Sequence, residues 1–128
     1  MILSNRYEDG LKARRKILGD EHVDRAEHNT NSFDEPFQTF ITESAWGSLW
    51  SRDTLPLRER SMLTIALLAA LGNTEEIAMH IRATANTSTS PEDVIEALLH
   101  VAVYAGVPKA NQAIKIAKIT YQEMGIEL

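Results

Sequence analysis

A nearly continuous apolar run in the middle of the chain limits the folds that this sequence can adopt. Residues 62–71 read MLTIALLAAL, and Gly72 follows directly. A run that is apolar on nearly all helical faces and ends at a glycine is typical of a helix in the centre of a domain. We therefore expect a buried core helix that begins at Leu57 and ends before Gly72. The run is too short to span a membrane.

The rest of the chain also favours helices, because no alternating strand pattern competes with helical spacing. Ser90 and Pro91 form a clear helix start, since a capping hydroxyl precedes a proline and two acids. Asn73 and Glu76 resemble a capping box, and Asp34 is placed to cap another helix. The sequence thus predicts an all-α fold. The expected helices cover residues 6–18, 34–50, 57–71, 73–85, 91–104 and 109–124, with a loop at 20–32 and a break at 51–56.

Composition excludes several classes of protein. A chain of 128 residues can form one domain with a real hydrophobic core. The net charge of -5 opposes binding to a nucleic-acid backbone. The absence of cysteine excludes disulfides, thiol nucleophiles and thiolate metal sites. The apolar part of residues 1–6 is too short for a signal peptide, and no segment reaches membrane-spanning length, so we expect a cytoplasmic protein without a membrane partner.

Two carboxylate–histidine pairs are the candidate chemical groups. Glu76 and His80 lie four residues apart, which places them on one face of a helix where the carboxylate can orient the ring. Glu96 and His100 repeat this spacing, and Tyr104 extends the same stripe. The functional interpretation is a proton-handling site. The alternative is an ordinary pair of surface neighbours, or a polar stripe that faces water or another subunit.

No metal site or nucleophilic hydrolase site is predicted. The histidines include no His-x-x-x-His pair, and His22 and His28 lie in the expected loop. The sequence also lacks a Gly-x-Ser-x-Gly elbow and a glycine-rich loop for phosphates. Because the chain also lacks cysteine, any redox chemistry would need a bound cofactor.

Four segments together resemble one enzyme family, the carboxymuconolactone decarboxylases. They are AWGSLWSR at 45–52, RSMLTIA at 60–66, HIRA at 80–83, and His100 followed by YAGVPKAN at 104–111. The resemblance covers nearly the whole chain, and LGDEHVDR at 18–25 is similar to an N-terminal extension of these enzymes. One difference is Ser88, which stands in a turn where family members often carry glycine.

The wider superfamily includes alkylhydroperoxidase accessory proteins with the redox motif Cys-x-x-Cys-x-x-x-His. The corresponding positions here are Asn73, Glu76 and His80. The histidine is retained and both thiols are absent, which removes peroxidase chemistry and leaves acid–base chemistry.

The resemblance implies decarboxylation of gamma-carboxymuconolactone to beta-ketoadipate enol-lactone in protocatechuate breakdown, without a metal or an organic cofactor. It suggests His80 as the acid that protonates the substrate, with Glu76 to orient it. Arg52 and Arg60 are candidates for binding carboxylates, because a guanidinium can form two parallel hydrogen bonds. Trp46, Trp50 and Tyr104 could line the substrate pocket, and the alternative for at least one tryptophan is core packing. His100 is a further candidate at the substrate, as a second proton carrier.

The resemblance also implies a fold and an assembly. The fold is a small helical bundle of the alkylhydroperoxidase D-like type, formed as one domain by residues 1–128. Residues 1–33 would form an N-terminal helix and loop extension, and residues 34–125 the helical core. The expected partners are a small lactone and further copies of the chain, commonly in a hexamer. Two other functions stay open: a non-catalytic oligomeric binding or stress protein, and a cofactor-independent hydrolase or isomerase that acts on a related lactone.

Overall fold

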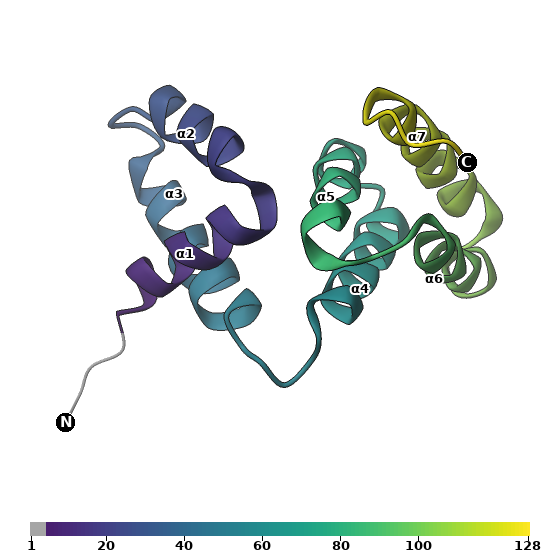
Figure 1. Ribbon diagram of the computed structural model, residues 1–128, viewed down its shortest axis with the longest axis horizontal. Coiled ribbons are helices and arrows are strands. Elements are labelled where there is room, and N and C mark those ends of the chain that lie inside the picture. Colours follow the sequence, from purple (N-terminus) through teal and green to yellow (C-terminus); the bar gives the residue numbers. More distant parts are fainter. Residues whose placement is uncertain (1–4) are drawn as a thin grey trace. The chain divides into compact units, whose positions relative to one another are not determined.

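The chain is helical throughout the part that the structure describes. The computed structural model describes residues 5–128, which contain seven α-helices, one π-helical segment and no strand (Figure 1). The predicted all-α class is therefore confirmed. No helix within these residues is long and apolar enough to cross a membrane. The prediction that the chain begins without a signal peptide concerns residues 1–6, and residues 1–4 lie outside the described residues. The chain divides into two compact units, Met1–Pro56 and Leu57–Leu128.

The first unit is built on the packing of its first helix against a π-helical segment. The buried residues of the first helix are Gly10, Arg14 and Ile17, and those of the π-helical segment include Trp46 and Trp50. These residues form the centre of the unit. Its elements are α1 (Arg6–Leu18), α2 (Asp20–Asn29), α3 (Glu35–Ile41) and the π-helix η1 (Thr42–Trp50).

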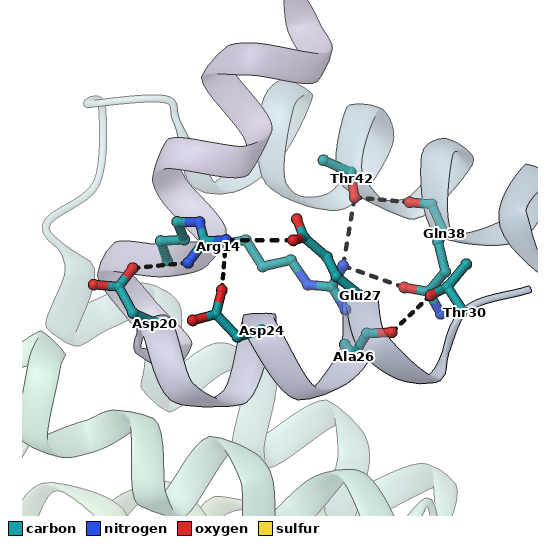
Figure 2. A network of polar contacts seen from close by, with 9 residues as sticks. Arg14, Asp20, Asp24, Ala26, Glu27, Thr30, Gln38 and Thr42 are labelled. Atoms are coloured by element: carbon teal, nitrogen blue, oxygen red, sulfur yellow. Dashed lines mark hydrogen bonds and ion pairs between the residues drawn. The ribbon is translucent and has the colours of Figure 1, made fainter.

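The loop predicted at residues 20–32 is wrong, because Asp20–Asn29 forms the helix α2. Its only fully buried residue is Val23, so the segment carries no apolar periodicity that would reveal a helix. Three carboxylates of this segment surround the Arg15 guanidinium instead. The oxygens of Asp20, Asp24 and Glu27 lie 3.0, 2.9 and 3.5 Å from its nitrogens. This ion-pair network joins α2 to α1 (Figure 2).

The helix predicted from Asp34 to Trp50 is helical over this range, but its second half is not an α-helix. From Thr42 on, the backbone is a π-helix, with hydrogen bonds between residues five apart in place of four. The Asp34 side chain does not cap α3 as predicted. Its Oδ1 atom accepts a hydrogen bond from the Asn31 amide at 2.9 Å, which closes the preceding turn.

The second unit is a four-helix arrangement with one apolar core. In this unit α4 packs on α5 and α6, and α7 contacts the other three helices. The core residues with the largest fully buried side chains are Ile65, Ile77, Ile81 and Leu98. The helices are α4 (Leu57–Leu71), α5 (Thr74–Thr87), α6 (Pro91–Tyr104) and α7 (Val107–Glu123).

The expectation that the central helix is buried on all sides is wrong for the single chain. One face of α4 is buried, with Ile65 and Ala69 in the core. Leu63, Leu67 and Leu71, on another face, are 53%, 61% and 69% exposed. The neighbouring helices of the second unit cover only part of α4. Several of its apolar side chains therefore stay exposed in the single chain.

The helix starts of the second unit test three cap predictions. The capping box at Ser90 and Asp93 is present, with the Asp93 amide donating to Ser90 Oγ at 3.1 Å. The capping box at Asn73 and Glu76 is absent, because Asn73 precedes α5 without a side-chain cap bond. α5 then runs to Thr87, two residues beyond its predicted end, and stops at Ser88 in a left-handed conformation (φ 57°). Serine therefore adopts here the conformation that favours glycine.

An ion pair between α4 and α6 gives this unit a testable pH dependence. Arg58 Nε and Nη2 donate to the two Asp93 oxygens at 2.9 and 2.6 Å. The Arg58 guanidinium, and then the Ser90 amide, hold the pKa of the Asp93 carboxyl well below its usual range. The pair therefore stabilises the fold above the unfolded-state pKa of about 3.9, and this contribution is lost as the pH falls toward the lower folded-state pKa.

We expect Asp93→Asn to lower the free energy of unfolding at pH 6 and to weaken its loss on acidification to pH 3. Denaturant titrations at the two pH values measure this difference. Glu92→Gln, at an exposed position beside Asp93, is the matched control. Equal acid sensitivity of wild type and Asp93→Asn would contradict the assignment.

Candidate active site

The strongest candidate for proton transfer is a histidine inside the second unit. His80 lies on α5 between the core residues Ile77 and Ile81, and only 6% of it is exposed. Glu76 lies one helical turn earlier and is exposed. The predicted helical spacing of the pair is confirmed, because both residues belong to α5. Orientation of the ring by the carboxylate stays a prediction.

A buried arginine lies on the adjacent helix. Arg60, in α4, is 7% exposed, and its Nε atom is buried without a hydrogen-bond partner among residues 5–128. Burial of a guanidinium is costly unless anions or acceptors compensate the charge. An anionic ligand at this position would compensate the charge of Arg60.

A chain of buried hydroxyl groups follows Arg60 directly. Ser61 Oγ donates to Thr87 Oγ1 at 2.8 Å, and Thr87 Oγ1 lies 2.8 Å from Thr89 Oγ1. All three residues are buried. The chain joins α4 to the end of α5 and fixes the backbone beside Arg60. This network was not predicted from the sequence, although the high density of hydroxyl residues at 84–90 was a visible signal.

The second carboxylate–histidine pair lies on the outside of α6. Glu96 and His100 are exposed, and Tyr104 is 85% exposed. The rings of His100 and Tyr104 stack with their centroids 6.3 Å apart and an angle of 12°. In the single chain, this group is a surface stripe, as the alternative interpretation predicted.

The remaining candidates belong to the first unit. Trp46 and Trp50 are 5% and 6% exposed, and their ring centroids lie 5.4 Å apart. Both tryptophans therefore contribute to core packing. Arg52 is exposed and follows the C-terminal end of η1.

The structure thus divides the predicted residues between the two units. In the second unit, His80 and Glu76 lie on α5, Arg60 lies on the preceding helix α4, and His100 and Tyr104 lie on α6. A cavity of about 370 Å³ between α6 and α7 contains none of the predicted residues, and its walls include Leu98, Ile114 and Tyr121. Within residues 5–128, no three acidic or imidazole side chains cluster in a way that suits a metal ion.

Comparison with known proteins identifies the family. The model of the Carboxymuconolactone decarboxylase family matches residues 35–118. The chain belongs to this family. The match begins at the start of α3 and includes His80, Arg60 and all of α4 to α6.

Two relatives of this carboxymuconolactone decarboxylase family member are similar to it over most of its length, and a third is similar over a shorter segment. The 4-carboxymuconolactone decarboxylase of Acinetobacter baylyi is 43% identical over 94% of this chain and 90% of its own length. The nitrosuccinic acid decarboxylase of Metarhizium robertsii is 36% identical over 92% of this chain and 82% of its own length. A 4-carboxymuconolactone decarboxylase of Pseudomonas putida is 48% identical over 33% of this chain and 88% of its own length. These relatives are all named as decarboxylases.

Proposed function

We propose that this chain is a carboxy-lyase that decarboxylates gamma-carboxymuconolactone to beta-ketoadipate enol-lactone, a reaction of protocatechuate catabolism. The observation that carries this proposal is the 43% identity, over 94% of the chain, to 4-carboxymuconolactone decarboxylase. The family match over residues 35–118 supports the same conclusion. Both observations favour a decarboxylase over a non-catalytic binding protein or a lactone hydrolase.

The chemistry of the substrate explains why the reaction needs no cofactor. Its departing carboxylate is attached to a ring carbon next to a carbon–carbon double bond. That double bond is conjugated with the lactone carbonyl. Loss of carbon dioxide leaves an electron pair that delocalises onto the carbonyl oxygen as a dienolate. The ring carbon next to the carbonyl then takes a proton, which completes the balance of atoms and charge. The protein therefore has to supply an acid, groups that stabilise the dienolate oxygen and groups that hold the carboxylates.

His80 is the proposed acid. Its burial supports the role, since a site that excludes water protects the dienolate and strengthens its electrostatic interactions. Glu76, one turn away on α5, is the proposed residue that orients the imidazole.

The arginines are proposed to recognise the substrate carboxylates. Arg60 is the stronger candidate, because its buried Nε atom has no partner among the described residues. Arg52 is proposed to bind the second carboxylate of the substrate, which belongs to the acetate side chain of the lactone. Lesser roles in substrate binding remain proposals for Trp46, Trp50, His100 and Tyr104.

Assembly and organisation belong to the same proposal. We propose one functional domain of the alkylhydroperoxidase D-like type over residues 1–128, with a 1–33 extension and a 34–125 core, in a cytoplasmic homo-oligomer, a hexamer. The exposed leucines of α4, Leu63, Leu67 and Leu71, support association between copies, because contiguous exposed apolar faces mark interaction sites. Light scattering measures the size of the assembly.

The nitrosuccinic acid decarboxylase favours a second candidate substrate. A nitro group attached to the carbon that loses carbon dioxide can accept the electron pair as a nitronate, so the same protein groups would serve. Comparison of kcat/KM for the two substrates, measured by carbon dioxide release, tests the assignment. We expect the lactone to be preferred, in agreement with the higher identity to the lactone enzyme. A preference for nitrosuccinate would replace the proposed substrate.

Removal of metal ions is expected to leave the activity unchanged. The dienolate delocalises its charge within the substrate, so no Lewis acid is required. Dialysis against a chelator, followed by steady-state assays and measurement of bound metal, tests this. Loss of turnover that added zinc or magnesium restores would contradict the proposed chemistry.

A further inference from the structure

The contact between α1 and η1 is too close for any side chain except that of glycine. A Cβ atom at Gly10 would overlap the carbonyl oxygen of Thr42 and lie 2.9 Å from the amide nitrogen of Gly47. A Cβ atom at Gly47 would overlap the carbonyl oxygen of Arg6 and lie 3.3 Å from that of Thr42. The two backbones therefore meet through a glycine on each side, and neither glycine has a positive φ that would explain its presence.

The atoms at this contact are those that define the π-helical register. Thr42 and Gly47, whose oxygen and amide face Gly10, lie five residues apart, which is the interval of π-helical hydrogen bonds, and Thr42 is the first residue of η1. The same interval recurs at the other end, where the Ser51 amide donates to the Trp46 oxygen at 3.1 Å. Gly10 thus lies against the place where the register changes from four residues to five.

A buried arginine of α1 also contacts the residue at which η1 begins. Arg14 follows Gly10 by one helical turn and is 8% exposed. Its Nη1 atom donates to Gln38 Oε1 at 3.2 Å and to Thr42 Oγ1 at 3.5 Å (Figure 2). The α1 face therefore contacts both the backbone and the side chain of the residue at which η1 begins.

We infer that Gly10 and Gly47 are positioning residues for substrate binding, because they hold Thr42–Trp50 in the π-helical register that directs Arg52. π-helical turns are rare and occur frequently at functional sites. A π-helix has more residues per turn than an α-helix, so a return to the α register would turn every later side chain, including Arg52. This inference rests on the proposed function, since it takes Arg52 as a substrate-binding group. It also gives a role to α1, which lies outside the matched family region of residues 35–118.

The test combines kinetics with a measurement that does not need activity. Gly10→Ala and Gly47→Ala are made in the full chain, alone and together with Arg52→Lys, and Lys12→Ala on the exposed side of α1 is the control. We expect each glycine variant to raise KM for the lactone about fivefold or more, with kcat within about twofold of wild type. In the Arg52→Lys background, the same changes should raise KM no further, because they act through Arg52. Amide hydrogen exchange should accelerate at residues 47–52 in the glycine variants and not in the control.

Each other result overturns the inference. Folded glycine variants with wild-type KM would do so, as would effects that add to that of Arg52→Lys, unchanged exchange at 47–52, or a kcat that falls with the folded fraction at constant KM. If the glycine variants do not fold, Arg14→Met takes their place, since it removes the donor to Gln38 and Thr42 and leaves the backbone contact of the glycines intact. If wild type lacks turnover, the proposed function fails, and hydrogen exchange still decides whether α1 holds the register.

Discussion

Replacement of His80 by glutamine is expected to lower kcat by about two to four orders of magnitude, the usual size of a general-acid contribution. Glutamine is polar and similar in size, so the core around Ile77 and Ile81 should persist. It cannot deliver a proton to the dienolate at neutral pH. Steady-state kinetics with the lactone, together with far-ultraviolet circular dichroism and light scattering, separate a chemical defect from a structural one.

The matched control is His28→Gln, at an exposed position on α2. This variant should retain wild-type kinetics, because no role in the reaction is assigned to His28. A correctly assembled His80→Gln variant with nearly normal turnover would remove His80 from the mechanism. Loss of assembly in that variant would instead assign His80 a structural role.

Replacement of Arg60 by methionine is expected to separate stability from activity. The variant removes a buried charge whose Nε atom has no partner among the described residues, and it fills the same space with an apolar chain. The free energy of unfolding should be unchanged or up to about 2 kcal/mol higher, because apolar replacement of buried charges is often neutral or stabilising. In contrast, kcat/KM should fall by about two orders of magnitude or more, since a substrate carboxylate loses its charged partner.

Two further variants define what Arg60 contributes. Arg60→Lys keeps the charge and loses the planar pair of donors, so it should remain impaired. Arg82→Met, on the exposed side of α5, removes a surface ion pair with Glu123 (2.9 Å) and should change neither stability nor activity appreciably. Strong destabilisation by Arg60→Met would mean that the arginine is structural. Wild-type kinetics of that variant would exclude it from substrate binding.

The sequence predicts the second unit better than the first. α4, α6 and α7 lie close to their predicted bounds, and the capping box at Ser90 forms as expected. α2 was missed because ion pairs to Arg15, and not an apolar stripe, accompany it. The π-helical register was missed because it depends on the contact with α1, which is distant in sequence.

Spacing alone predicts helical faces but not their burial. Glu76 and His80 have the same separation as Glu96 and His100, yet the first histidine is buried and the second is exposed. The difference arises because α5 directs His80 inward, while α6 directs His100 outward. The local sequence does not determine which side of each helix faces the core. Only the packing of the whole unit therefore distinguishes the two pairs. For the same reason, the sequence did not reveal that Arg60 is buried.

The most direct test of the proposed function is incubation of the purified protein with gamma-carboxymuconolactone, with quantification of both carbon dioxide and the organic product. We predict release of one equivalent of carbon dioxide for each lactone consumed, with the enol-lactone as the product. Ring opening without carbon dioxide would indicate a lactone hydrolase. Absence of any reaction, from protein that is folded and assembled, would contradict the decarboxylase assignment and favour a binding protein of the same family.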